Sequence, residues 1–161
     1  MDDLVCIMYY FHSTSCVSRI GMQTFLPYED YKQTAQCLDY RRLGKQRIEC
    51  KQILNALSGN SKGWTNHPAT LMWKGYEYEL CQYAISICKE WRARGYKDQQ
   101  LTWFIKEHEN YYTIGQPAWL GDIGFHLSHR SNLLRKDFVF YNNYNWNVPN
   151  DMEYVWPSRT E

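Results

Sequence analysis

An amphipathic helix is predicted for the stretch Asp39-Tyr-Arg-Arg-Leu-Gly-Lys-Gln-Arg-Ile-Glu-Cys-Lys-Gln-Ile-Leu-Asn-Ala-Leu57. Asp39 belongs to the residue types that cap helix N-termini, and Gly59 stands just past the predicted C-terminal end, where glycine is common. Apolar side chains recur at helical spacing along one face, namely Leu43, Cys50, Leu54 and Leu57. This face is expected to pack into a core, and the opposite face stays available for chemistry.

Four further helices are predicted around this one. They cover residues 28–37, residues 68–95, a segment after Asp98 and a segment that Asp122 caps. Residues 114–122 contain Gly and Pro and are predicted to form a loop, and residues 141–157 combine Tyr and Trp with Asn and Pro. We therefore predict an all-α fold, a compact single-domain helical bundle with an extended aromatic C-terminal strap.

The chain of 161 residues has the size of one domain, and its 44% hydrophobic and 22% charged residues are typical of globular proteins. We assign residues 22–161 to the helical domain and residues 1–21 to an N-terminal extension. The extension is interpreted either as a tail packed on the domain or as the product of a start codon placed too early. Its apolar run, residues 4–11, follows Asp2 and Asp3 and is too short to span a bilayer, so neither a signal peptide nor a membrane anchor is predicted.

Aromatic residues are unusually frequent, with seven Trp, fourteen Tyr and six Phe, so some rings are expected to face a ligand. The six cysteines form no C-x-x-C pair and are interpreted as reduced core residues, not as disulfides or zinc ligands. The formal net charge is only +1, so a phosphate-binding surface has to come from local clustering of cations. The common nucleotide-binding, zinc-protease and serine-hydrolase motifs are absent from the sequence.

The predicted central helix carries such a cluster of cations. Its members are Arg41, Arg42, Lys45, Arg47 and Lys51. One interpretation is a solvated helix face with an ordinary Lys45 to Glu49 pair four residues apart. The other interpretation is that the cations bind phosphates while Glu49 acts as an acid or base. Neighbouring cations would favour the free amine of Lys45, whereas the negative charge of Glu49 would favour its ammonium form.

Histidines mark two other candidate sites. His67 precedes a predicted helix and either caps it or helps to bind an anion there. The helix after Asp122 gathers residue types suited to phosphate and base contacts, namely His126, His129, Arg130, Asn132, Arg135 and Lys136. His126 and His129 lack a third metal ligand nearby, so no metal site is predicted. One concave, positively charged surface is expected to carry Arg41, Arg42 and Lys45 together with His126, His129 and Arg130.

Four motifs, taken together in their order and spacing, resemble the pyrimidine-dimer DNA glycosylase (phage endonuclease V-type) superfamily, in its bacterial and phage branch. They are Met22-Gln-Thr-Phe-Leu-Pro27, Leu38-Asp-Tyr-Arg-Arg-Leu-Gly-Lys-Gln-Arg-Ile-Glu49, Asn66-His-Pro-Ala-Thr70 and Phe125-His-Leu-Ser-His-Arg-Ser-Asn-Leu-Leu-Arg-Lys136. The resemblance spans Met22 to about Pro157. It implies an all-helical domain that kinks duplex DNA, extrudes a nucleotide, cuts the N-glycosidic bond and then nicks the abasic strand.

The resemblance also implies catalytic groups. The family's nucleophile is a free α-amine at the mature N-terminus, helped by a glutamate. Arg42 stands where that glutamate is expected, and Glu49 is our substitute for it. Met22 would carry the amine in a chain that begins there, and Lys45 is the alternative amine.

These observations lead to one hypothesis and one rival. The hypothesis is a DNA glycosylase, with abasic-site lyase activity as a further expectation, that acts on a damaged or modified pyrimidine by nucleotide flipping. Its expected partner is double-stranded DNA with a lesion or a modified base. No cofactor, no metal and no membrane partner are expected, and the protein is expected to be a monomer. Its expected location is the cytoplasm, in association with the nucleoid, or the cytoplasm of the host cell if the protein is viral. The rival is a non-catalytic nucleic-acid-binding or protein-interaction module on the same fold.

Overall fold

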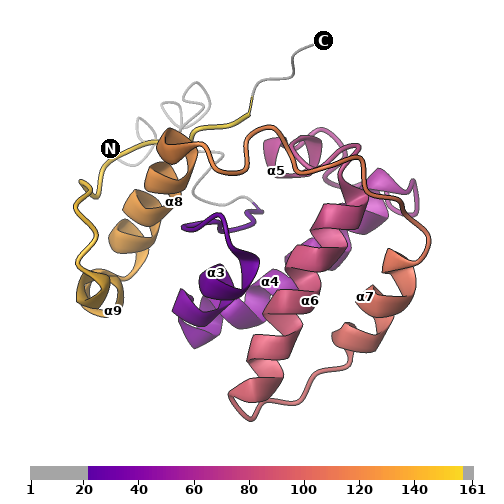
Figure 1. The fold of residues 1–161 in the computed structure, drawn as a ribbon, viewed down its shortest axis with the longest axis horizontal. Helices are drawn as coiled ribbons and strands as arrows, with labels where there is room; N and C mark the ends of the chain where they lie inside the picture. The colour runs from indigo at the N-terminus through magenta and orange to yellow at the C-terminus, as the bar shows by residue number, and fades with distance from the viewer. Residues whose placement is uncertain (1–21, 158–161) are drawn as a thin grey trace, which may run out of the picture.

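The computed structural model describes residues 22–157, which are helical with irregular connections (Figure 1). Seven α-helices lie in this part of the chain: α3 (Tyr31–Cys37), α4 (Tyr40–Leu57), α5 (Pro68–Leu71), α6 (Glu77–Ala93), α7 (Gln100–His108), α8 (Ile123–Lys136) and α9 (Phe138–Tyr141). A 3-10 turn, η2 (Asn142–Tyr144), follows α9. The described residues contain no strand, which confirms the all-α prediction. The predicted N-terminal extension lies outside the described residues.

The helix α4 is the one that the opening motif predicts. The Asp39 side chain accepts hydrogen bonds from the backbone N–H groups of Arg41 (3.0 Å) and Arg42 (3.2 Å), and so caps the N-terminus. The apolar face of α4 packs against α6, and α6 in turn packs against α3 and α7. The buried side chains on this face are Leu43, Cys50, Ile53 and Leu54.

The predicted single helix over residues 68–95 is wrong, because the chain forms two helices there. The short α5 ends at Leu71, and α6 begins only at Glu77. Between them Gly75 has a φ of +87°, a left-handed conformation that glycine adopts without steric cost and that ends helical hydrogen bonding. The Glu77 side chain accepts from the Gly75 N–H (3.2 Å) and stabilises this turn.

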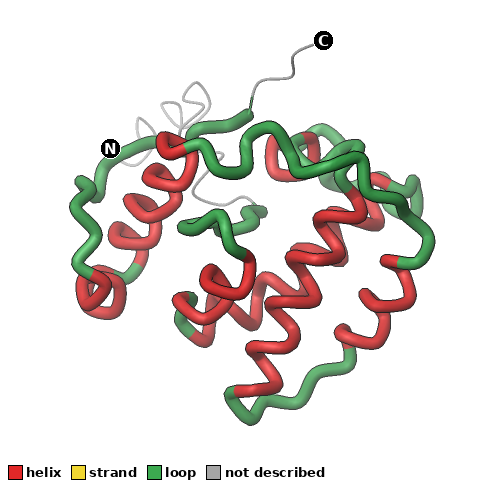
Figure 2. The backbone as a smooth tube through the Cα atoms, in the orientation of Figure 1, coloured by secondary structure: helices red, strands yellow, loops and turns green. Residues whose placement is uncertain are grey.

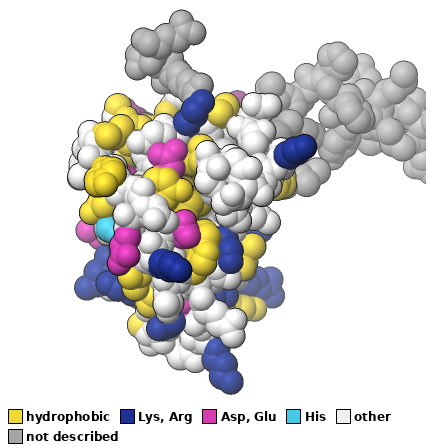
Figure 3. Space-filling view, turned by 90° about the vertical axis from the view of Figure 1, so that its right-hand side faces the viewer, with side chains coloured by type: hydrophobic (Ala, Val, Ile, Leu, Met, Phe, Trp, Pro, Cys, Tyr) yellow, Lys and Arg dark blue, Asp and Glu magenta, His cyan; other side chains and the backbone are white. Residues whose placement is uncertain are grey.

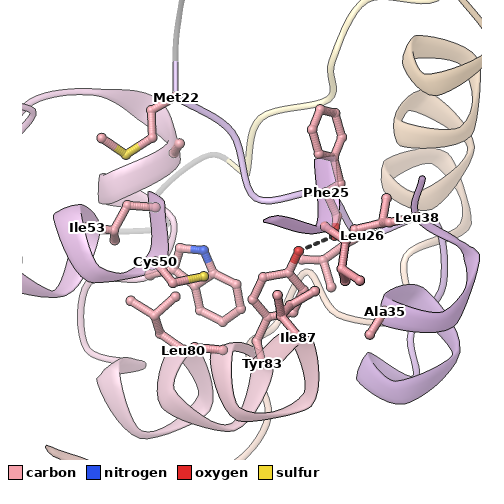
Figure 4. Close-up of a cluster of buried hydrophobic side chains, with 14 of the residues drawn as sticks. Met22, Phe25, Leu26, Ala35, Leu38, Cys50, Ile53, Leu80, Tyr83 and Ile87 are labelled. Carbon is pink, nitrogen blue, oxygen red and sulfur yellow. Dashed lines mark hydrogen bonds between the residues drawn. The ribbon is translucent and has the colours of Figure 1, made fainter. Parts of the chain in front are cut away.

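An extended segment, residues 22–27, passes through the interior of the molecule, and all six of its residues are buried. It makes no sheet, so side chains of the helices satisfy its backbone groups. The Tyr83 hydroxyl, for example, donates to the Phe25 carbonyl oxygen (2.6 Å), the bond dashed in Figure 4. Met22, Phe25 and Leu26 belong to the main hydrophobic cluster. We call residues 22–27 the core segment below.

The predicted C-terminal strap begins later than expected. Its first residues are helical, in α9 and η2, and the chain is irregular from Asn145 to Pro157 (Figure 2). The Trp146 ring stacks on those of Tyr141 (centroids 5.7 Å apart) and Tyr144 (5.2 Å), and this stacking turns the strap back along the molecule. Backbone N–H groups of the strap then donate to hydroxyls of α8, as Val155 does to Ser128 (3.1 Å).

Two composition-based expectations can be compared with the described residues. Cys37, Cys50, Cys81 and Cys88 are all free and buried, as expected for reduced core residues. No helix among residues 22–157 is both long and apolar enough to cross a membrane. On the face that lies over α7, basic, acidic and apolar side chains are interspersed (Figure 3).

Candidate functional site

Cations from α4 and α8 meet at one pocket of about 250 Å³. Its lining residues are Phe25, Arg41, Arg42, Lys45, Lys136 and Asp137. The first turns of α4 supply three of the cations, and the C-terminal end of α8 supplies Lys136. Of the residues singled out on α8, Lys136 therefore shares a surface with the cations of α4. We call this feature the cationic pocket.

The electrostatics of the cationic pocket favour an anion. Arg42 is partly neutralised by its ion pair with Asp39 (2.9 Å). Arg41 is exposed, and its guanidinium Nε donates to the Tyr40 hydroxyl (3.1 Å). Desolvation and the positive charges of neighbouring side chains, Arg42 foremost, lower the pKa of Lys136. A phosphate group bound here would relieve this repulsion between cations.

Glu49 lies one helical turn beyond Lys45, on the same side of α4. Its side chain is only 6% exposed, and its Oε1 lies 3.3 Å from the Lys45 ammonium. Burial is the largest influence on the carboxyl group and raises its pKa, while Lys45, the backbone of Gln23 and Gln46 act in the opposite direction. A carboxyl group with these properties can both hold and release a proton, which acid–base catalysis requires.

Gln46 fixes the position of Glu49 and was missed in the sequence. Its Nε2 donates to Glu49 Oε2 (2.8 Å) and to the Gln23 carbonyl oxygen (2.9 Å). Its Oε1 accepts from the Phe25 N–H (3.0 Å) and lies 2.8 Å from the Tyr83 hydroxyl, which shares its single proton between this oxygen and the Phe25 carbonyl oxygen. All four of its hydrogen-bonding positions are used. The only signal in the sequence is that an amide stands three residues after Leu43 and four before Cys50, on the apolar face of the helix.

The expectation that His126 and His129 line the positively charged surface is wrong. Both are buried, at 6% and 1% exposure, and both bind the backbone of Leu26. His129 Nδ1 accepts from the Leu26 N–H (3.0 Å), while His126 Nδ1 pairs with the Leu26 carbonyl oxygen (2.7 Å). His126 Nε2 accepts from the Gly121 N–H (2.9 Å), so this ring is neutral and its Nδ1 is the donor.

Arg130 acts on the core segment as well. Its Nε donates to the Pro27 carbonyl oxygen (2.8 Å), and its guanidinium lies 4.7 Å from the centroid of the Tyr28 ring. His126, His129 and Arg130 are therefore partners of the core segment, and they do not line the cationic pocket. Sequence patterns could not reveal this, because a backbone partner and a phosphate partner require the same polar residue types.

Two other predicted contact residues, Arg47 and Asn132, are also engaged within the protein. Arg47 pairs with the buried Asp98, and its guanidinium lies 4.6 Å from the centroid of the Trp91 ring. The buried Asn132 donates to the carbonyl oxygens of Ser128 (2.8 Å) and Met152 (3.1 Å).

Arg135 and His67 likewise have partners in the protein. Arg135 donates to the carbonyl oxygens of Asn150 (3.1 Å) and Met152 (3.2 Å) in the strap. His67 caps α5, because its Nδ1 accepts from the Ala69 N–H (3.1 Å), and burial lowers its pKa. The helix cap that one of the two interpretations of His67 predicts is therefore present.

The described residues contain no group of three or more His, Cys, Asp or Glu side chains arranged to hold a metal ion. Comparison with known proteins gives one match. Residues 22–103, just over half of the chain, match the family model described as pyrimidine dimer DNA glycosylase. The matched range includes the core segment, the cations of α4 and Glu49. No curated protein and no solved structure matches the chain.

Proposed function

The chain belongs to the pyrimidine dimer DNA glycosylase family, and on this basis we propose that it removes a damaged or modified pyrimidine from duplex DNA. The observation that carries the proposal is the buried Glu49, with its raised pKa, one helical turn from a cationic pocket. The cations would bind backbone phosphates around a lesion, and the carboxyl group would transfer protons at the sugar. Flipping a nucleotide out of the helix costs least at a distorted lesion, which favours damaged DNA before any bond is cut.

We assign the nucleophilic role to Lys45, because its Nζ lies 3.3 Å from Glu49, the group able to accept its proton. In the proposed first step Lys45 passes a proton to Glu49, and the free amine forms a bond to C1′ of the extruded nucleotide. The bond between C1′ and the base nitrogen breaks, and its electron pair leaves with the base. The base takes up the proton held by Glu49.

An abasic-site lyase step would follow from the same intermediate. The bond between C1′ and O4′ breaks as the amine nitrogen loses a proton, O4′ gains a proton, and an imine forms between Lys45 and C1′. Loss of a C2′ proton to Glu49 then eliminates the 3′ phosphate, which nicks the strand. Glu49 serves as the proton carrier throughout.

The Met22 nitrogen is the second candidate nucleophile. In the 161-residue chain it is a peptide nitrogen and cannot attack C1′. The neighbouring Gln23 backbone contributes a hydrogen bond to Glu49, so residue 22 adjoins the carboxyl group. A protein whose chain starts at Met22 would therefore present a free amine close to Glu49.

Borohydride trapping tests the proposal. The protein is incubated with abasic or dimer-containing duplex in the presence of borohydride, and the covalent complex is mapped by peptide analysis. We expect a complex linked through Lys45 that Lys45→Arg abolishes, whereas the matched variant Lys136→Arg still forms it. Glu49→Gln is expected to slow base release about 100-fold or more while DNA affinity changes little, because an acid–base group acts mainly in the transition state.

The other outcomes contradict defined parts of the proposal. Linkage to Lys136 or to an α-amine would overturn the assignment of Lys45. Base release without trapping would make water the nucleophile and leave a glycosylase without the lyase step. Absence of both trapping and base release on all lesion substrates would favour the rival, a non-catalytic nucleic-acid-binding or protein-interaction module.

A further inference from the structure

The short helix α9 exposes apolar side chains directly beside the cationic pocket. Phe138 is 54% exposed, Val139 is 85% exposed and Phe140 is 38% exposed. These residues follow Lys136 and Asp137, which line the pocket, without any intervening residue. Three consecutive exposed apolar residues cost solubility, and Phe138 and Val139 do not belong to the hydrophobic core cluster that would explain their presence.

Hydrogen bonds at both ends of α9 hold its backbone in place, so the positions of these side chains are fixed as well. The Asp137 carboxylate accepts from the Phe140 N–H (3.1 Å) and caps the helix. The Asn143 side chain donates to the carbonyl oxygens of Val139 (3.1 Å) and Phe140 (3.0 Å) at the other end.

A buried tyrosine ties the same helix to α4. The Tyr141 hydroxyl donates to Asp39 Oδ2 (2.5 Å) and accepts from the Asp39 N–H (3.0 Å). Asp39 also caps α4, the helix whose first turns carry the cations of the pocket. The exposed apolar residues and the cations are therefore fixed relative to one another through one carboxylate.

The charge next to these apolar residues indicates what they contact. An apolar protein groove alone would leave the four cations at the edge of the patch without a partner, so the ligand has to be anionic around an apolar interior. Duplex DNA has this character, since phosphates flank a stack of bases. Exposed apolar side chains that enter such a stack unstack one base step, and neighbouring cations hold the backbone on either side.

We propose that Phe138 and Val139 form a wedge that enters the base stack of duplex DNA beside the nucleotide that is extruded. The inference rests on the proposed function for the identity of the ligand, and it adds the structural group that opens the duplex. The cationic pocket holds the backbone while the wedge occupies the space that the extruded nucleotide leaves. Tyr40, which is 52% exposed at the start of α4, contacts Arg41, a residue of the cationic pocket.

The wedge can be tested with duplexes that carry 2-aminopurine next to an abasic-site analogue, because the fluorescence of this base rises when it is unstacked. The test variant is Phe138→Ser/Val139→Ser. The matched control is Ile123→Ser, since Ile123 is 74% exposed at the opposite end of α8. We expect the double variant to lose at least four fifths of the fluorescence rise and to release bases about 10-fold more slowly from paired duplex than the native protein.

Substrates with an unpaired lesion separate a wedge from a general loss of activity. Where the base opposite the lesion is absent, little unstacking is needed, so base release by the double variant should recover to within about 2-fold of the native protein. Circular dichroism and Tm of both variants should match those of the native protein, because all three positions are on the surface.

Three results would overturn the wedge. They are an unchanged fluorescence rise in the double variant, an equal loss in Ile123→Ser, and slow release that persists on the unpaired substrate. The fluorescence measurement needs no catalysis, so it can support the wedge even if no base is released. Base release without a fluorescence change would support the proposed glycosylase activity and contradict the wedge.

Discussion

At the scale of single residues, the neutral state of His129 is a condition for the native fold. Its Nδ1 accepts from the Leu26 N–H, which an imidazolium ion cannot do. Burial, with a smaller contribution from His126, lowers the pKa of His129 to about 3 from an ordinary value of 6.5. In the unfolded chain the same ring takes up a proton near its ordinary pKa. Protons therefore bind the unfolded state more tightly than the folded one.

This difference predicts a pH dependence of stability with a defined sign. Above pH 6.5 both states carry a neutral ring, so the contribution is complete; as the pH falls from 6.5 towards 3, only the unfolded state gains a proton and stability is lost. We expect His129→Asn, whose amide oxygen can still accept from Leu26, to reduce the slope of unfolding free energy against pH by about 1 kcal/mol per pH unit.

Urea unfolding between about pH 4 and pH 6 provides the measurement. Other groups that titrate in this range, such as Asp39 and Asp98, are present in both proteins and cancel in the comparison. Equal slopes for the native protein and His129→Asn would show that the ring is protonated in the fold.

Residue types alone could predict some of the site but not all of it. Arg41, Arg42 and Lys45 were placed correctly on one surface, because helical spacing determines which side chains share a face. The partners of Arg47 and His129 are 51 and 103 residues away in the chain, so local patterns contain no information on them. The sequence pattern of α8 therefore predicts a binding surface, although His126, His129 and Arg130 bind the core segment instead.

At the scale of the helices, the contact between Asp39 and Tyr141 joins the start of α4 to α9. One carboxylate caps α4, pairs with Arg42 and accepts from a hydroxyl at the other end of the sequence. Its hydrogen bonds, to Tyr141 and Arg42, outweigh burial and lower the pKa of Asp39. The group is thus charged at neutral pH and fully hydrogen-bonded, a condition under which buried carboxylates stabilise a fold.

Asp39→Ala is expected to reduce the free energy of unfolding by about 2–4 kcal/mol, since it removes a cap and leaves buried partners unsatisfied. Asp39→Asn should cost less because asparagine also caps helices, and Tyr141→Phe should cost about 1–2 kcal/mol. Denaturant unfolding of both single variants and the double variant measures the coupling between Asp39 and Tyr141. We expect a coupling free energy of at least about 1 kcal/mol between the two side chains. If the losses of stability in the single variants simply add up in the double variant, other contacts join the two helices.

Helices were predictable where the signals are local and strong. Asp39 and Asp122 cap α4 and α8 as the sequence indicates, because the capping hydrogen bonds involve residues two or three positions away. The break before α6 was not foreseen, since the apolar spacing runs on from Met72 to Tyr76 across it. Gly75 in a left-handed conformation breaks the helical path there, and the Glu77 side chain stabilises the turn.

At the scale of the whole molecule, a net charge of +1 gives little long-range attraction for DNA. Binding must therefore come from the cationic pocket, where Arg41, Arg42, Lys45 and Lys136 are close together. Each phosphate that a cation neutralises releases counterions, so the logarithm of the affinity falls linearly with the logarithm of salt concentration. One phosphate contact from each of these four cations predicts a slope of roughly −4.

Removing one cation should flatten this slope. We expect Arg41→Ala to change it by about one unit, whereas the control Lys106→Ala, exposed on α7, should leave it unaltered. Fluorescence anisotropy with labelled duplex across a salt series is the measurement. Salt-independent binding, or an equal effect of both variants, would locate the DNA elsewhere on the protein.

The path of the core segment has a consequence for how this protein assembles. Its backbone is satisfied by Gln46 of α4, Tyr83 of α6 and His129 of α8, which come from early, middle and late parts of the chain. A half-assembled form that lacks α8 would leave the Leu26 amide without its acceptor in an apolar interior. We therefore expect the core segment to be fully satisfied only after synthesis has reached α8, because His129 supplies the acceptor for the Leu26 N–H.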